Sequence, residues 1–245
     1  MSLPNVAEVR KKIEAVTDPL VKHWLMTQYL VDGRPCELAA RRYRSDRAQV
    51  YGQHLTASLT RELGHEATLI EVTTAKRLKE KGLEPQNRVS QTTRVIALPL
   101  EYEPWAKQVH RWITTHKPPF NCYKQDINTY VLNNQTFGDL TYPIEYYELW
   151  ENGEIIAHKE EHTKPFRLHA LRHLRTTELV EVYDFDGIDL ALYGGWSFRR
   201  IAQAEGMQSN VFSGAGALAG AMKRYAHIQY KRYFPKLLRK PNWSV

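Results

Sequence analysis

A short basic segment between Arg167 and Leu179 holds the residue types that are best suited to act on a charged substrate. It reads R-L-H-A-L-R-H-L-R-T-T-E-L, with three arginines and two histidines among leucines at helical spacing. His169 and Arg172 are three residues apart, so on a helix their side chains project from the same side. A basic helix face exposed to water has the same composition. The segment alone therefore permits an anion site without proving one.

The overall charge favours a polyanionic partner. The chain has 245 residues, with 34 Lys and Arg against 27 Asp and Glu, a formal net charge of +7 and a pI near 9.3. Each phosphate that a basic side chain neutralises releases counterions, so an excess of this kind favours association with nucleic acid. We therefore expect nucleic acid first among the partners.

The composition also argues against several classes of protein. The two cysteines, Cys36 and Cys122, lie far apart and lack the spacing of a disulfide framework or a zinc site. No apolar run is long enough to span a bilayer, and the first residues do not have the pattern of a signal peptide. We expect a cytoplasmic protein with no membrane partner, no metal and no cofactor.

The elements that would position the basic segment are mainly helical. Residues 6–44 have apolar positions three and four residues apart, with a break at Val31-Asp32-Gly33 and a new helix start at Arg34-Pro35. Further helices are predicted at 103–116, 168–183 and 186–196, whereas 46–64 is predicted to be helix and loop.

Two segments rich in β-branched residues predict a strand pair. A-T-L-I-E-V-T-T-A-K begins at Ala67, and T-T-R-V-I-A-L-P-L ends at Leu100. A long polar connection with several basic residues joins them. The middle of the chain, 120–164, gives weaker signals, although a hairpin turn is expected at Asn152-Gly153.

Short motifs along the chain resemble those of the tyrosine recombinases, the phage integrase family. H-A-L-R-H at 169–173 resembles the family's H-x-L-R-H motif, and G-R-P-C-E-L at 33–38 resembles its helix start G-x-R-x-x-E-L. Lys76, in V-T-T-A-K-R, is placed like the family's β-hairpin lysine.

Two further motifs follow in the family's order. L-Y-G-G-W-S at 192–197 resembles the L-L-G-H-S element, with Trp196 at the position where most members carry histidine. K-R-Y-A-H at 223–227 resembles the Y-x-H segment that carries the nucleophilic tyrosine. The resemblance covers about residues 12–234, although no motif matches the middle of the chain.

The resemblance implies a metal-independent enzyme that cleaves and rejoins double-stranded DNA. Tyr225 would attack a phosphodiester and form a covalent 3′-phosphotyrosine, while Arg34 and Arg172 would bind the phosphate oxygens. His169 would hydrogen-bond the phosphate or assist proton transfer, and Lys76 would protonate the departing 5′ oxygen. The implied catalytic residues are Arg34, Lys76, His169, Arg172, Trp196 (as an indole N–H donor) and Tyr225.

Other residues have supporting roles or competing interpretations. Glu37 would orient Arg34, and His173 would support Arg172. Arg34 could instead pair with Glu37 on a helix surface, and Trp196 could belong to the core. Arg167 and Arg175 are interpreted as solvated. The candidates for DNA backbone contacts are Lys79, Lys81, Arg199 and Arg200, of which the two lysines are also alternatives to Lys76.

The implied fold is α+β and mainly helical, the tyrosine recombinase catalytic-domain fold with a small antiparallel β-sheet at one edge. Residues 1–245 would form a single catalytic domain, with the family's N-terminal core-binding domain absent or removed. Residues 197–224 would be an inserted segment before the nucleophile, and 235–245 a C-terminal tail. Because of the insertion, Tyr230 and Tyr233 stay open as alternatives to Tyr225.

Three functions are compatible with these motifs. The first is a site-specific recombinase or integrase, which by resemblance would self-associate on DNA as a tetramer. The second is a DNA-binding protein on the same fold that does not cut. The third is an enzyme like the type IB topoisomerases, which shares the chemistry but does not choose a site.

Overall fold

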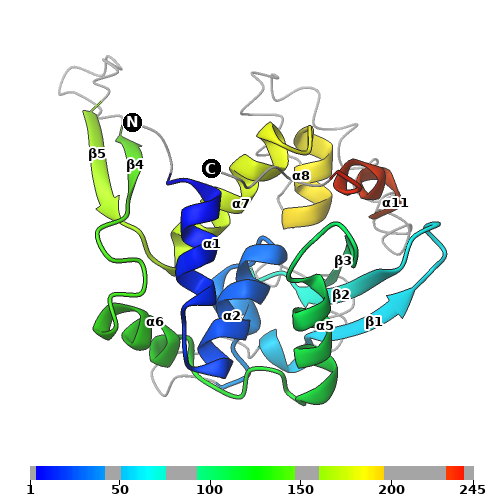
Figure 1. The fold of residues 1–245 in the computed structure, drawn as a ribbon, viewed down its shortest axis with the longest axis horizontal. Coiled ribbons are helices and arrows are strands. Elements are labelled where there is room, and N and C mark those ends of the chain that lie inside the picture. Colours follow the sequence, from blue (N-terminus) through cyan, green and yellow to red (C-terminus); the bar gives the residue numbers. More distant parts are fainter. Residues whose placement is uncertain (1–3, 42–50, 76–92, 147–159, 196–229, 240–245) are drawn as a thin grey trace, which may run out of the picture.

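The computed structural model describes residues 4–41, 51–75, 93–146, 160–195 and 230–239 (Figure 1). These residues contain a three-stranded antiparallel sheet, a two-stranded antiparallel sheet and helices that pack around them. The α+β class with a small antiparallel sheet, expected from the sequence, is confirmed.

Three helices begin the chain: α1 (Val6–Glu14), α2 (Pro19–Leu30) and α3 (Pro35–Leu38). Each of the first two starts at a side chain that caps the helix, since Asn5 and Asp18 accept hydrogen bonds from backbone amides of the first turn. The predicted break at 31–33 is confirmed. The predicted continuous helix before it is divided, because Asp18-Pro19 starts a second helix.

The larger sheet has the order β1 (Thr56–Thr60), β2 (Ala67–Thr73) and β3 (Thr93–Pro99). The predicted pair β2–β3 is confirmed, with Ile70 opposite Ile96. The interpretation of 46–64 as helix and loop is wrong for β1, although η1 (Tyr51–His54) is a short helical turn. Strand β1 lies at the sheet edge with no fully buried side chain, so it lacks the apolar signal of a strand.

The middle of the chain adds α5 (Ala106–Thr115), α6 (Lys124–Asn133) and two strands, β4 (Thr141–Tyr146) and β5 (Glu160–Pro165). Strands β4 and β5 pair antiparallel up to Tyr146 opposite Glu160. The expected turn at Asn152-Gly153 lies between them in sequence, outside the described residues.

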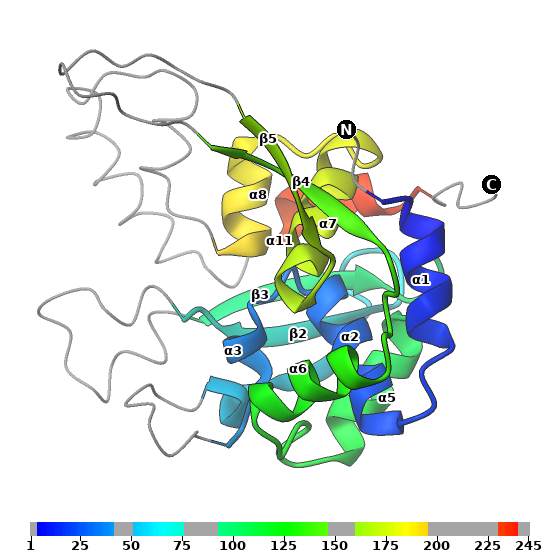
Figure 2. The same cartoon turned by 90° about the vertical axis from the view of Figure 1, so that its left-hand side faces the viewer.

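The last described elements are α7 (Leu168–Glu181), α8 (Gly187–Gly194), α11 (Tyr230–Tyr233) and η5 (Phe234–Leu237). Helix α7 confirms the helix predicted at 168–183. Helix α2 lies between the pair α7–α8 and the pair α5–α6 (Figure 1 and Figure 2). None of the described helices combines the length and apolar character needed to cross a bilayer.

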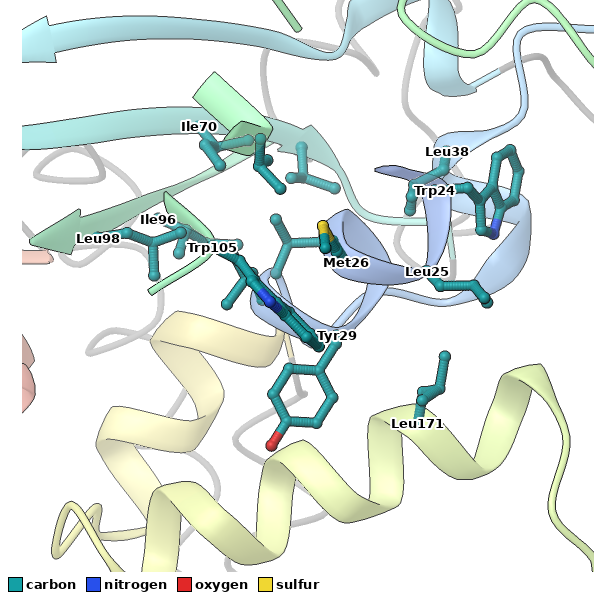
Figure 3. Packing of buried hydrophobic residues seen from close by; sticks show 14 of the residues in the cluster. Trp24, Leu25, Met26, Tyr29, Leu38, Ile70, Ile96, Leu98, Trp105 and Leu171 are labelled. Atoms are coloured by element: carbon teal, nitrogen blue, oxygen red, sulfur yellow. The ribbon is translucent and has the colours of Figure 1, made fainter. Parts of the chain in front are cut away.

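The core forms where α2 meets the sheet on one side and α7 on the other (Figure 3). Met26 and Tyr29 of α2, Ile96 of β3 and Leu171 of α7 are almost completely buried there. Trp105, just before α5, packs edge-on against Tyr29. Burial of these large side chains fixes α7 against α2, and so fixes where its polar residues lie.

Four charged residues, Arg10, Glu103, Arg175 and Glu178, form a buried ion-pair network beside this core. Arg175 donates to Glu178 at 2.5 Å and to Glu103 at 3.1 Å, and Arg10 donates to Glu103 at 3.1 Å. The Tyr29 hydroxyl donates to Glu178 at 2.6 Å. The interpretation of Arg175 as solvated is therefore wrong: its side chain is 0% exposed, and Glu178 of the same helix and Glu103 of a distant segment compensate its charge.

Candidate functional site

Arg172 lies on the buried side of α7, where it joins three segments of the chain. Its Nη1 donates to the Asp32 carbonyl oxygen at 2.7 Å, and its Nη2 donates to the Gly194 carbonyl oxygen at 2.9 Å. Nη2 also lies 3.3 Å from the Asp32 carboxylate. Burial lowers the pKa of Arg172, and the negative charge of Asp32 opposes that shift. The guanidinium group thus connects the end of α2 with the end of α8.

Asp32 belongs to the turn that ends α2, and its backbone conformation is fixed by a positive φ and a hydrogen bond. Its φ is 48°, in the left-handed region that Asp and Asn tolerate better than most residues. The Gly33 amide donates to the Gln28 carbonyl at 2.9 Å, which ends α2. Thr176, one turn after Arg172, donates to the Asp32 carboxylate at 3.0 Å. Burial raises the pKa of Asp32, while the nearby charge of Arg172 opposes the rise.

Arg34 comes directly after this turn and precedes α3. Its Nη1 donates to Glu37 Oε1 at 2.9 Å, and its backbone N–H donates to Glu37 Oε2 at 3.1 Å. Its side chain is 16% exposed, whereas Glu37 is 0% exposed. Arg34 and Glu37 do form an ion pair. The pair does not lie on a helix surface, as the alternative to a catalytic Arg34 supposed, because the Glu37 carboxylate is inside the protein.

Glu37 also binds two groups from the sheet. Arg94 of β3 donates to Glu37 Oε2 at 2.9 Å, and the Ala75 amide after β2 donates to Oε1 at 3.1 Å. Burial acts to raise the pKa of Glu37, but the charges of Arg94 and Arg34 outweigh it and hold the pKa below its usual value. Glu37 is therefore an anion that two arginines share.

We call Arg34, Arg94, Arg172, Asp32 and Glu37 the arginine site. Besides burial, the charges of Arg34 and Arg94 lower the pKa of Arg172, so the three guanidinium groups act on one another. Three cations face two carboxylates. The site therefore carries excess positive charge, which suits an anion with several oxygens, such as a phosphodiester.

The two histidines of the H-A-L-R-H motif are exposed, whereas Arg172 is buried, so His169 and Arg172 do not share one environment as their spacing led us to expect. His169 and His173 contact each other edge to face, with ring centroids 5.0 Å apart, and Tyr142 stacks on His173 at 6.0 Å. Partial burial and the charge of Arg172 lower the pKa of His173. His173 therefore packs between the Tyr142 ring and the His169 ring.

Several of the predicted residues lie outside the described part of the chain. They are Lys76, Lys79, Lys81, Trp196, Arg199, Arg200 and Tyr225. Two of the described stretches end immediately before predicted residues, one at Ala75 before Lys76 and one at Gly195 before Trp196. The ends of both stretches contact the arginine site, since the Ala75 amide donates to Glu37 and the Gly194 carbonyl accepts from Arg172.

Comparisons of the chain with protein-family models, with curated proteins and with solved structures found no match. The arginine site therefore has to be interpreted from its own chemistry.

The two alternative tyrosines occupy buried positions on α11. The Tyr233 hydroxyl donates to the Val95 carbonyl at 3.2 Å and accepts from the Ala97 amide at 3.4 Å. Tyr230 is also buried, and burial raises its pKa. Tyr233 anchors α11 to β3. To act as a nucleophile, its hydroxyl would have to give up these hydrogen bonds to the strand.

Three basic residues in and after α11 are paired with carboxylates. Arg232 donates to Asp189 at 2.8 Å and to Asp186 at 2.5 Å, and Lys236 donates to Asp189 at 2.5 Å. Arg239 pairs with Asp184. These contacts hold the described C-terminal residues near the start of α8, and they give each of these three basic side chains a carboxylate partner, although Arg232 and Arg239 stay about half exposed.

Sequence reasoning missed Arg94 and Asp32. The sequence pattern places Arg94 in the β-branched segment T-T-R-V-I-A-L-P-L and assigns it no role. A charged residue within a buried strand needs a buried partner of opposite charge, and this requirement is the signal that could have identified Arg94. The pattern around Asp32 predicts only a helix break.

Among the described residues, no group of three or more His, Cys, Asp or Glu side chains is arranged to hold a metal ion.

Proposed function

We propose that this chain is a tyrosine recombinase, which cleaves and rejoins DNA through a covalent 3′-phosphotyrosine. The observation that supports it most is the arginine site. Arg34 and Arg172 come from motifs far apart in the sequence, and a single buried cluster in which cations exceed carboxylates includes both. A site for a bridging phosphate needs such an excess of positive charge.

In the proposed reaction, the Tyr225 hydroxyl attacks phosphorus as its proton passes to a base. The bond from phosphorus to the 5′ oxygen breaks, and that oxygen takes a proton from a general acid, assigned to Lys76. Arg34, the more exposed arginine, binds the phosphate oxygens directly. Arg172 contributes its positive charge from its buried position, where it also holds the turn at Asp32 through the Asp32 carbonyl. The reverse attack by a 5′ hydroxyl restores the DNA strand.

The roles of the other motif residues follow from their chemistry. His169 hydrogen-bonds the phosphate or assists proton transfer at the tyrosine, and Trp196 donates its indole N–H. Arginine charges replace a metal ion in stabilising the transition state, because charge spreads over the phosphoryl oxygens during transfer. Recombination joins two duplexes, so we also propose that the chain associates with copies of itself on DNA.

The proposal is tested by covalent capture on DNA of unknown target sequence. The wild-type chain is incubated with a pool of duplexes that have a randomised centre and a single nick. Cleavage near a nick releases the short fragment that carries the 5′ hydroxyl. Religation then fails because this hydroxyl has diffused away, and the covalent adduct accumulates. Adducts that survive denaturant are recovered and sequenced, and the selected duplex is then used in single-turnover assays.

Three variants identify the nucleophile. We expect Tyr225→Phe to abolish the adduct, while Tyr230→Phe and Tyr233→Phe keep it, since Tyr233 has a structural partner in β3. Loss of the adduct in Tyr230→Phe alone would move the nucleophile to that residue. DNA binding without any adduct in the wild type would reject cleavage and leave a DNA-binding protein.

A further inference from the structure

Arg94, which no motif singles out, joins three segments of the chain at the arginine site. Its Nη1 donates to Thr74 Oγ1 at 3.0 Å, and its Nη2 donates to the Val31 carbonyl at 3.2 Å and to Glu37 at 2.9 Å. Its side chain is 6% exposed. One guanidinium group therefore ties together the end of β2, the end of α2 and the buried carboxylate that holds Arg34.

The end of α8 also lies against Arg94. Gly195 has φ of 66°, and a Cβ added there would lie 2.9 Å from two side-chain atoms of Thr74 and 3.2 Å from Arg94 Cδ. Only glycine fits both the backbone conformation and the contact. Arg94 and Thr74 thus form the surface on which the chain leaves α8, one residue before Trp196.

Arg94 also sets the charge available at Arg34. Glu37 would neutralise Arg34 if the two were paired alone, and an arginine neutralised by a buried carboxylate attracts phosphate weakly. A second guanidinium on the same carboxylate divides its charge between two cations. The cluster of Arg34, Arg94 and Glu37 keeps a net positive charge as a result.

We propose that Arg94 is a positioning residue for strand cleavage, which holds Arg34, the end of β2 and the end of α8 around Arg172. The proposal rests on the proposed function, because it concerns the geometry of the same site. Arg94 acts through Glu37 and Thr74, and itself needs no contact with DNA. Its loss affects the rate of the chemical step more than the binding of DNA.

The test compares Arg94→Lys and Arg94→Met with the wild type on the selected nicked duplex. Adduct formation is followed in a single turnover at saturating DNA, and the DNA dissociation constant is measured separately. For Arg94→Met we expect a rate lower by about a hundredfold, as for a displaced reacting group, with little change in DNA affinity. Arg94→Lys recovers part of the rate, because it keeps the charge but not the planar group.

Arg10→Gln is the matched control, since Arg10 is an equally buried arginine in the separate ion-pair network. We expect it to lower stability and leave the adduct rate unchanged below its unfolding temperature. Thr74→Val removes one acceptor of Arg94 with little change of shape, and we expect a smaller loss of rate. It carries the test, together with Arg94→Lys, if Arg94→Met does not fold.

Two results would overturn the proposal while leaving the proposed function intact. In one, Arg94→Met cleaves as fast as the wild type at saturating DNA. In the other, the rates of all the variants follow their stabilities, Arg10→Gln included, and lysine gives no rescue. Absence of an adduct in the wild type is a different result, which rejects the proposed function and the role of Arg94 with it.

Discussion

Arg172 and Arg175 lie one turn apart on α7, yet they belong to two differently built groups of charges. Arg175 belongs to the buried ion-pair network, where two arginines face two glutamates. Aromatic rings surround it, with the Arg175 guanidinium 5.3 Å from the Tyr29 ring and 5.8 Å from the Tyr193 ring. All of its charge is compensated within the protein.

The arginine site is built differently. Its three arginines face two carboxylates, and several of their hydrogen bonds go to backbone carbonyl groups, at Val31, Asp32 and Gly194. A carbonyl oxygen orients a guanidinium group without cancelling its charge. One member, Arg34, is partly exposed, whereas Arg175 is not.

The comparison shows that one helix carries a charge-balanced cluster and an unbalanced one. A balanced, buried network holds elements in place and has no net charge with which to attract an anion. An unbalanced cluster costs free energy until an anion arrives, which is the property that a phosphate site requires. Charge balance, together with the partial exposure of Arg34, distinguishes the two groups.

The largest effect is expected at Arg172. Arg172→Gln removes a cation from the arginine site, so adduct formation should fall about a thousandfold or more, as when an arginine that stabilises phosphoryl transfer is lost. The measurement is the single-turnover rate on the selected nicked duplex, at a temperature where circular dichroism shows folded protein. A rate equal to that of the wild type would remove the distinction between the two groups.

The next effect concerns stability. Arg175→Met leaves Glu178 and Glu103 with fewer buried partners, so unfolding by urea should show a loss of about 3–5 kcal/mol. The double variant Arg175→Met with Glu178→Gln should regain part of it, because an uncompensated charge is removed. Adduct formation by the folded fraction should not change. A slower reaction without a change in stability would contradict the structural role.

The smallest effect is a pH dependence of stability. Burial acts to raise the pKa of Glu178, but the charges of Arg175 and Arg10 outweigh it, so the pKa in the folded state is lowered. Its contribution to stability is therefore complete above the unfolded value of about 4.3 and is lost as the pH falls through the lowered folded value. Urea midpoints between neutral and acidic pH measure it. Glu178→Gln should flatten this dependence, and an unchanged slope would reject the assignment.

Local patterns were sufficient for elements that bury a regular apolar stripe. Helix α7 and the pair β2–β3 were predicted because their buried side chains recur at the spacing of a helix or strand. Strand β1 and helix α6 were missed. Only Ile127 and Val131 of α6 are buried, and β1 has no buried side chain, so neither has a repeat long enough to recognise.

The candidate site divides in the same way. Arg34 and Arg172 were singled out by the residue types and order of short motifs. Arg94 was missed because its importance comes from contacts with Val31, Thr74 and Glu37, which no local pattern contains.

The sequence by itself determined the helix and strand periods, the basic charge and the motif arginines that the proposal assigns to a phosphate. Only the tertiary structure decided that Arg175 is compensated by Glu103 and Glu178, while Arg172 joins an excess of cations. The reason is physical: spacing along a helix fixes which face a residue occupies, whereas its charge balance depends on partners far away in the sequence, such as Asp32, which is 140 residues from Arg172.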